Sequence, residues 1–168
     1  MWPANSLLCR FAHSVICRGL TDGEIESLFE LCEVRQVKGG AKLFSEGQPA
    51  DALWVLISGD VEVSSGGKVL AEVGPGAALG ELSLFRSVPT RSATVTAICD
   101  VTVIRLSGPQ FKKRLAAHDL AALKIVSNLA HQMADRLLAL NTRFLNGGQK
   151  GLAVARGELR RVVGLGGG

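Results

Sequence analysis

Two short motifs in the middle of the chain, Gly80-Glu81-Leu82 and Arg91-Ser92, carry a carboxylate, a guanidinium and a hydroxyl. Gly80 lets a ligand approach the backbone closely, and the amides that follow it begin a helical turn whose N–H groups are unpaired. Arg91 can offer a two-pronged hydrogen bond to a phosphate, and Ser92 can add a neutral donor. Glu81 is suited to accept a hydrogen bond from a ligand hydroxyl. These residue types predict a site for one phosphate and a neighbouring sugar hydroxyl.

The same segment offers no residues for catalysis. No base, nucleophile or set of metal ligands accompanies the two motifs, which predicts binding rather than turnover, with no catalytic residue and no metal. The four cysteines form no Cys-x-x-Cys pair, and the three histidines do not cluster with them. We therefore expect buried, reduced thiols in a cytoplasmic protein that carries no cofactor.

A series of short strands must position these motifs. From about residue 34, β-branched runs alternate with glycine-rich turns, a pattern typical of an all-β sandwich or barrel. The helix-forming residues 79–85 interrupt the series, and Val88-Pro89 limits them to a single turn. The expected fold is mainly β with flanking helices, a β-roll or jelly-roll sandwich with a short phosphate-binding helical turn and a long C-terminal helix. The predicted strands span residues 34–37, 42–44, 53–57, 61–63, 69–73, 92–97 and 101–106.

Helices are expected on either side of the strands. Capping-box patterns at Thr21 to Glu24 and at Ser107 to Gln110 each predict the start of a helix. Asp119 is expected to cap a long helix that runs to about Phe144. The predicted organisation is a helix or linker over residues 1–20, a domain over 21–144 and a glycine-rich mobile tail over 145–168. The acid-free residues 1–21 also faintly resemble a transit peptide, which is the alternative to a helix or linker.

The long helix carries two apolar stripes. The first has the 3, 4, 3, 4 spacing of a heptad seam, and the second flanks it. We expect one stripe to cover the sandwich and the other to form a homodimer through the helix at 119–144; the alternative is a single helix buried against its own domain. The seam consists of Leu123, Val126, Ala130, Met133, Leu137, Leu140 and Phe144, and the flanking stripe of Ala122, Ile125 and Leu129.

Charge is divided unevenly along the chain. Residues 1–104 hold 8 basic and 12 acidic side chains, whereas residues 105–168 hold 11 basic and 3 acidic side chains. The basic residues are scattered through the helical pattern, which predicts a solvated helix face rather than a nucleic-acid patch.

No apolar run reaches the ~18 residues that a membrane helix needs, so we expect no membrane span.

At the two motifs the chain resembles the cyclic nucleotide-binding domain family. The family's phosphate-binding cassette reads Gly-Glu-Leu/Met, an apolar turn, then Arg-Ser/Ala/Thr-Ala-Thr, and residues 80–84 and 91–95 match it. The segments 40–47 and 51–54 and Gly59 are also similar, and the resemblance covers about residues 20–142. The ten-residue spacing from Glu81 to Arg91 is similar to that of bacterial catabolite activator proteins.

The resemblance implies a role for each residue of the two motifs. Glu81 would bind the ribose 2′-hydroxyl. Arg91 would bind the cyclic phosphate, assisted by Ser92 and by the amides from Gly80 to Leu82. Because serine rather than threonine follows Arg91, the resemblance implies cAMP as the ligand, with cGMP as the alternative.

The resemblance also implies residues that line the rest of the pocket. Val73, Leu82 and Val95 would line the sugar and the base. The family closes its pocket with the last helix, so Asn141 or Thr142 would touch the base.

The function implied is a regulatory module that senses a cyclic nucleotide and relays it through its C-terminal helices to a partner or attached domain. One alternative is a ligand-free dimerisation domain in which Glu81 and Arg91 form a structural ion pair. Another is the regulatory end of an enzyme or channel. The segment after Asn141 lacks the capped helix pair of a winged helix-turn-helix, so no DNA-binding domain is expected in this chain.

Overall fold

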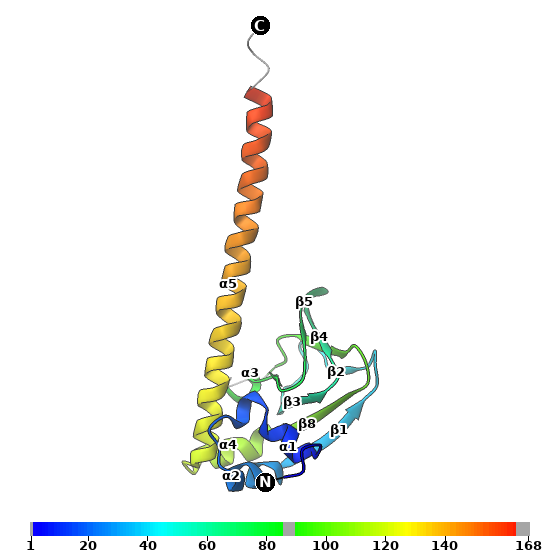
Figure 1. The fold of residues 1–168 in the computed structure, drawn as a ribbon, viewed down its shortest axis with the longest axis vertical. Helices are drawn as coiled ribbons and strands as arrows, with labels where there is room; N and C mark the ends of the chain where they lie inside the picture. Colours follow the sequence, from blue (N-terminus) through cyan, green and yellow to red (C-terminus); the bar gives the residue numbers. More distant parts are fainter. Residues whose placement is uncertain (1, 86–89, 164–168) are drawn as a thin grey trace. The chain divides into compact units, whose positions relative to one another are not determined.

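A computed structural model describes residues 2–85 and 90–163 (Figure 1). The chain divides into two compact units, Met1–Leu129 and Ala130–Gly168. The first unit holds two antiparallel sheets with flanking helices, which confirms the predicted jelly-roll fold class. The second unit holds the greater part of the last helix.

Eight strands form the two sheets of the first unit. Their order is β1-β8-β3-β6 in one sheet and β2-β7-β4-β5 in the other. All seven predicted strands are present, although β7 begins two residues later than predicted. The two-residue β6, paired with Trp54 and Val55, escaped prediction because it is too short for a periodic pattern. The strands are β1 (Cys32–Val37), β2 (Lys42–Phe44), β3 (Ala52–Ser58), β4 (Val61–Ser65), β5 (Lys68–Val73), β6 (Ala78–Leu79), β7 (Thr94–Ala97) and β8 (Val101–Ser107).

The central strand β3 is buried on both faces because each face meets a different core. Leu53, Val55 and Ile57 join the core beneath the helices. Trp54 and Leu56 face the other way, into the core shared by strands of both sheets. Since side chains alternate along a strand, this arrangement explains the continuous apolar run of β3.

Two N-terminal helices and one 3-10 turn pack against the first sheet. They are α1 (Leu7–Ala12), η1 (Val15–Cys17) and α2 (Asp22–Phe29). Phe11 and Ile16 are completely buried in the core beneath the helices, so residues 1–20, predicted as a helix or linker, contribute to this core. The capping box at α2 is present as predicted: the Thr21 hydroxyl accepts from the Glu24 amide, and the Glu24 carboxylate accepts from the Thr21 amide.

The second predicted capping box does not form. Helix α4 (Gly108–Ala116) begins after Ser107, whose side chain makes no capping hydrogen bond. Ser107 is still the last residue of β8, and the Gly108 amide instead donates to the Asp51 carbonyl over 2.7 Å. The strand-to-helix junction is therefore fixed by backbone pairing with Asp51.

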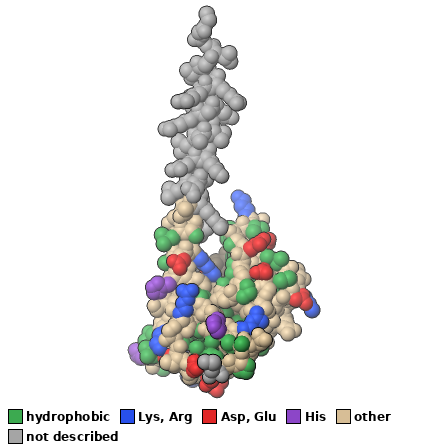
Figure 2. All heavy atoms as spheres, in the orientation of Figure 1, with side chains coloured by type: hydrophobic (Ala, Val, Ile, Leu, Met, Phe, Trp, Pro, Cys, Tyr) green, Lys and Arg blue, Asp and Glu red, His purple; other side chains and the backbone are tan. Residues whose placement is uncertain are grey.

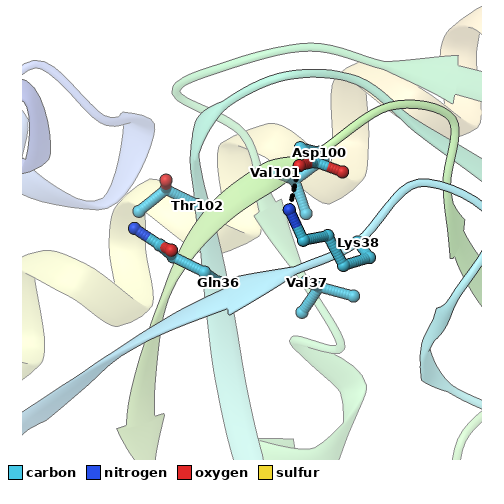
Figure 3. A pocket seen from close by; sticks show the side chains of 6 residues that line it. All are labelled: Gln36, Val37, Lys38, Asp100, Val101 and Thr102. Carbon is cyan, nitrogen blue, oxygen red and sulfur yellow. Dashed lines mark hydrogen bonds and ion pairs between the residues drawn. The ribbon is translucent and has the colours of Figure 1, made fainter.

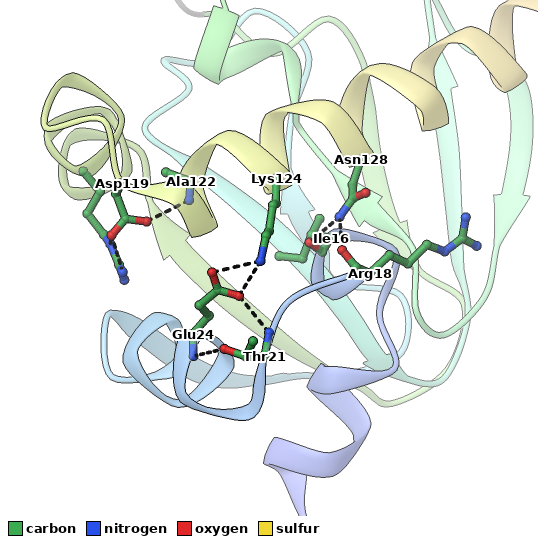
Figure 4. Close-up of polar contacts among 9 residues, drawn as sticks. Ile16, Arg18, Thr21, Glu24, Asp119, Ala122, Lys124 and Asn128 are labelled. Atoms are coloured by element: carbon green, nitrogen blue, oxygen red, sulfur yellow. Dashed lines mark hydrogen bonds and ion pairs between the residues drawn. The ribbon is translucent and has the colours of Figure 1, made fainter.

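The first turns of α5 (Leu120–Val163) are tied to the N-terminal segment (Figure 4). The Asp119 carboxylate accepts from the Ala122 amide over 2.9 Å, which confirms the predicted cap. The Lys124 ammonium donates to the Glu24 carboxylate over 2.8 Å, and the Asn128 amide donates to the carbonyls of Ile16 and Arg18. These contacts all lie within the first unit and fix the start of the helix.

The two predicted stripes of α5 differ in burial. Ala122, Ile125 and Leu129 of the flanking stripe are buried in the core of the first unit. Leu123 and Leu137 of the heptad seam are exposed, at 46% and 59%. The side chains of Leu140 and Phe144, predicted to belong to the seam, lie outside the described residues.

The predicted end of the long helix near Phe144 is wrong, because α5 continues to Val163. The glycines of this stretch cost about 1 kcal/mol each relative to alanine, but the segment has no proline and many good helix formers. The predicted mobility of the tail stays a prediction, and its last residues, 164–168, lie outside the described residues.

Among the described residues, no helix combines the length and the apolar character that crossing a membrane requires. Figure 2 shows acidic and basic side chains interspersed over the face that it draws. Five of the eleven basic side chains of residues 105–168 lie outside the described residues, so the predicted solvated helix face stays a prediction.

Candidate functional site

The first predicted motif lies at the turn between β6 and the short helix α3 (Leu82–Phe85). This single turn confirms the helical interruption of the strand series. Gly80 adopts a φ of +73°, in the left-handed region that favours glycine. A Cβ atom built on Gly80 would collide with Nη1 of Arg91. The backbone at Gly80 and the guanidinium of Arg91, eleven residues later, are therefore in direct contact.

Arg91 is anchored through its backbone. Its amide donates to the Gln48 carbonyl over 2.8 Å, and its carbonyl accepts from the Gly47 amide over 2.9 Å. These bonds hold the segment before β7 against the turn that follows β2. The contact between its guanidinium and Gly80 brings Arg91 to the predicted turn, and its role toward a ligand stays a prediction.

The Arg91 side chain is buried, with only 5% of the residue exposed. Nη1 donates to the Ala52 carbonyl over 2.9 Å, and the guanidinium carbon lies 4.1 Å from the centre of the Phe44 ring. Nε is buried without a hydrogen-bond partner among the described residues. A buried guanidinium with an unused donor is energetically unfavourable unless an anion satisfies it.

Burial lowers the pKa of Arg91 below its usual value, because the charged form loses hydration. Asp51 acts in the opposite direction: its carboxylate lies 3.9 Å from Nη2 of Arg91 and favours the charged form. Arg105, a second nearby cation, lowers the Arg91 pKa further. Arginine stays protonated at neutral pH in spite of such shifts, so the site presents a positive charge.

Glu81 is also buried, with 8% of the residue exposed. Its carbonyl accepts from the Leu84 amide over 3.0 Å, which stabilises the start of the helical turn. Glu81 directly follows Gly80, whose backbone contacts the Arg91 guanidinium, so a buried acid and a buried cation come from adjoining parts of the fold. This pair can bind a ligand that carries both a hydroxyl and a phosphate.

The other residues predicted to line the pocket lie in varied surroundings. Val95 is buried in the core between the sheets, and Val73 packs against the same core. Ser92, directly after Arg91, is exposed. Leu82 begins α3, and its side chain lies outside the described residues.

The two residues predicted to touch the base lie in the second unit. Asn141 and Thr142 are both exposed on α5, and the Thr142 hydroxyl donates to the Leu138 carbonyl over 3.0 Å. Their contact with a ligand stays a prediction.

Three groups around Arg91 were not assigned to the site from the sequence. They are the ring of Phe44, the carboxylate of Asp51 and the carbonyl of Ala52. Phe44 and Asp51 belong to segments that resemble the family, which was a usable signal. A backbone carbonyl leaves no signal in the sequence, because any residue supplies one.

A separate hollow of about 270 Å³ lies at the surface between β1 and β8 (Figure 3). Two of its lining residues, Lys38 and Asp100, form an ion pair with an N–O distance of 2.6 Å, and both side chains are mostly exposed. Neither predicted motif contributes to this hollow. It is lined by Gln36, Val37, Lys38, Asp100, Val101 and Thr102.

Comparison with known proteins places this geometry in context. Residues 34–118 match the family model of the cyclic nucleotide-binding domain. The chain is 36% identical over 155 residues to glutaminase 1 of Bradyrhizobium diazoefficiens, covering 84% of this chain and 25% of the glutaminase. The chain therefore spans about a quarter of the length of that curated relative.

Solved structures that share the fold include the following two. A cyclic nucleotide-binding domain from Methylobacillus flagellatus matches with a TM-score of 0.75 at 23% identity, over 86% of this chain and 85% of that chain. The catabolite activator protein of Thermus thermophilus matches with a TM-score of 0.64 at 26% identity, over 77% of this chain and 62% of that chain.

Proposed function

Because this chain belongs to the cyclic nucleotide-binding domain family, we propose that it is a regulatory module that binds cAMP and relays its presence through the C-terminal helices. cGMP is the competing ligand of the same chemistry. The proposal includes no catalytic step and no cofactor: the nucleotide acts as a signal, and its binding energy shifts the module between two conformations.

The observation that carries this proposal is the state of Arg91. Among the residues that the structure describes, the buried guanidinium has an unused Nε donor. Backed by Phe44 and beside a glycine turn, it is suited to a singly charged cyclic phosphate. Glu81, buried in the next turn, would accept from the ribose 2′-hydroxyl. The amides around Gly80 and Leu82 and the Ser92 hydroxyl would add donors, and Val73 and Val95 would contact the sugar and base.

A relay needs an element that leads from the site to a target. The Gly108 amide that opens α4 bonds to the carbonyl of Asp51, whose carboxylate faces Arg91. Helix α4 leads through Asp119 into α5. In the related glutaminase the matching segment makes up a quarter of the protein, so an attached domain or a partner is the proposed target of the relay.

We further propose a homodimer through the helix at 119–144. The flanking stripe at Ala122, Ile125 and Leu129 is already buried in the first unit, and Val126 of the heptad seam packs partly against the same core. The exposed part of the seam is therefore what is left to meet a partner. Exposed Leu123 and Leu137 on a regular seam favour a second copy of the same helix.

The thiols are consistent with a reducing, cytoplasmic location. Cys9, Cys17, Cys32 and Cys99 are free in the structure. The expectation that the thiols are buried is correct only for Cys17, because Cys9 and Cys32 are half-buried and Cys99 is exposed. Burial raises the pKa of Cys17 to about 11 and that of Cys32 to about 12, so both stay protonated and unreactive.

Isothermal titration calorimetry with cAMP and with cGMP tests the proposal. Saturable one-to-one binding of cAMP per chain, with a Kd of about 1 µM or tighter, is expected. Absence of heat with either nucleotide, in a protein that melts cooperatively, would favour the ligand-free dimerisation domain instead.

A further inference from the structure

Asp51 lies between two arginines and is much closer to one of them. Its Oδ2 accepts from Nη2 of Arg105 over 2.6 Å, whereas its Oδ1 lies 3.9 Å from Nη2 of Arg91. The first contact is a short charge-assisted hydrogen bond, and the second is too long to be a hydrogen bond. The carboxylate is therefore bound to Arg105 and only faces Arg91.

Arg105 is held rigidly enough to fix the carboxylate. It lies on β8, directly opposite Trp54 of β3 and Glu33 of β1. Its side chain is only 16% exposed, and Nη1 lies 3.4 Å from the Glu33 carboxylate. The Asp51 side chain, by contrast, is 65% exposed, so it is free to turn if its partner is removed.

An unrestrained Asp51 would compete with an anionic ligand. A carboxylate that forms a short pair with Arg91 occupies the same guanidinium that a phosphate needs and cancels its charge. The Ala52 carbonyl and the Phe44 ring, which also contact Arg91, are uncharged and do not compete in this way. Arg105 removes the competitor and adds a second positive charge near the site.

We propose that Arg105 is a positioning residue that holds Asp51 away from Arg91 and so keeps the guanidinium available to the phosphate of the ligand. The inference rests on the proposed function for the identity of the ligand. The arrangement of the three side chains, Arg91–Asp51–Arg105, can be tested without any ligand.

A double-mutant cycle isolates the effect of Asp51. Arg105→Met keeps the side-chain length and removes the charge, and it is expected to weaken cAMP binding about fivefold or more. In the Asp51→Asn background the same change should cost about twofold or less, because no carboxylate is left to move. Arg105→Lys, which keeps a charged donor, should restore most of the affinity. Equal losses in both backgrounds would overturn the proposal.

Arg35→Met serves as the matched control. Arg35 lies on β1, pairs with Glu33 over 2.8 Å and is not paired with Asp51. Its removal takes away one positive charge from the same sheet and should leave cAMP affinity within about twofold of wild type. A loss as large as that of Arg105→Met would assign the effect to net charge rather than to Asp51.

The arginine Nε–H resonances report on the same arrangement without ligand. In ¹⁵N spectra of the unliganded protein, the Arg91 Nε–H signal, assigned with Arg91→Lys, should shift in Arg105→Met and return in the double variant with Asp51→Asn. An unmoved signal in Arg105→Met would overturn the proposal. If wild type binds neither cAMP nor cGMP, the proposed function fails, and this spectrum alone decides the positioning role.

Discussion

The backbone of Gly80 and the guanidinium of Arg91 are packed so closely that no side chain can be placed between them. With a φ of +73° at Gly80, the position that a Cβ atom would occupy lies against Nη1 of Arg91. Any other residue would therefore both strain the backbone and displace the arginine. Two residues eleven positions apart thus form one structural feature. Glycine is required there for the shape of the site and not only for the turn.

Gly80→Ala should therefore affect binding and stability together. We expect cAMP affinity to fall about tenfold or more and the protein to be destabilised by more than the ~1 kcal/mol that a positive φ alone costs alanine. Gly40→Ala is the matched control, since Gly40 has a φ of +81° and open space around its Cβ position. The control should lose stability but retain affinity. Calorimetry and chemical denaturation measure both, and equal affinity for the two variants would contradict the role of the Gly80–Arg91 contact.

Arg91→Ala should weaken cAMP binding at least tenfold. The change removes a charge-assisted hydrogen bond of about 1.5–3 kcal/mol, and more if the guanidinium is fully desolvated in the complex. Arg91→Lys keeps the charge but loses the paired N–H donors of the guanidinium, so it should bind cAMP with intermediate affinity. Calorimetry measures the three constants. Unchanged affinity in Arg91→Ala would show that the nucleotide, if it binds, binds elsewhere.

The preference between the two nucleotides depends on the residue after Arg91. Serine at position 92, exposed beside the site, resembles the cAMP-binding bacterial members of the family. We expect wild type to prefer cAMP, and Ser92→Thr to raise the relative affinity for cGMP, because the added methyl group restricts the rotamer of the hydroxyl. Competition against a fluorescent cAMP analogue measures the ratio. A wild type that prefers cGMP would reverse the assignment.

The sequence was sufficient for the features that rest on local patterns. The seven longer strands, the capping box at Thr21 and the cap at Asp119 follow from periodicity and short-range chemistry. Ser107 shows the limit: its pattern is that of a capping box, but pairing of Gly108 with Asp51 keeps it in the strand. The same kind of long-range contact explains the site.

Arg91 and Glu81 were found from the sequence because their residue types and spacing form a motif. Asp51 and Arg105 were not placed beside Arg91, because no local pattern joins the residue that precedes β3 to a residue within β8. Only the register of β3 with β8 brings them together. Tertiary pairing of this kind has no short-range signature.

The ion pair between Glu24 and Lys124 predicts a dependence of stability on pH. The hydrogen bond from Lys124, followed by that from the Thr21 amide, lowers the pKa of Glu24 below its ordinary value. A carboxylate with a lowered pKa stabilises the fold above its unfolded pKa, and this contribution is lost as the pH falls through the folded value. Wild type should therefore be more stable than Glu24→Gln at pH 7, and the difference should shrink between about pH 5 and pH 3.

Chemical denaturation across this range measures the difference. Glu30→Gln, which removes an exposed carboxylate just after the same helix, is the control and should show no such convergence with wild type. A constant difference between wild type and Glu24→Gln at every pH would mean that the ion pair does not contribute to the docking of α5.

The seam on α5 predicts the oligomeric state. Leu137 is 59% exposed and lies on the heptad seam, so Leu137→Glu would place a charge in the proposed apolar interface. We expect light scattering to show a wild-type dimer at ~100 µM, a concentration well above ordinary dimer constants. Leu137→Glu should be monomeric with its sandwich still folded. Ala139→Glu, an exposed position off the seam, should remain a dimer, and a monomeric wild type would refute the interface.

Signalling through α4 and α5 predicts a change in hydrogen exchange on binding. The Gly108 amide is bonded to the Asp51 carbonyl, and the first turns of α5 are held by Lys124 and Asn128. A nucleotide phosphate bound to Arg91 would change the electrostatic interaction between Arg91 and Asp51. The change should reach Gly108 first, and then the helices that follow it. Saturating cAMP should therefore alter protection across residues 108–144, more strongly in wild type than in Leu137→Glu, whose helix lacks its partner. If the protein binds cAMP but its protection is identical with and without cAMP, the assignment of the ligand stands and the proposed signalling route is wrong.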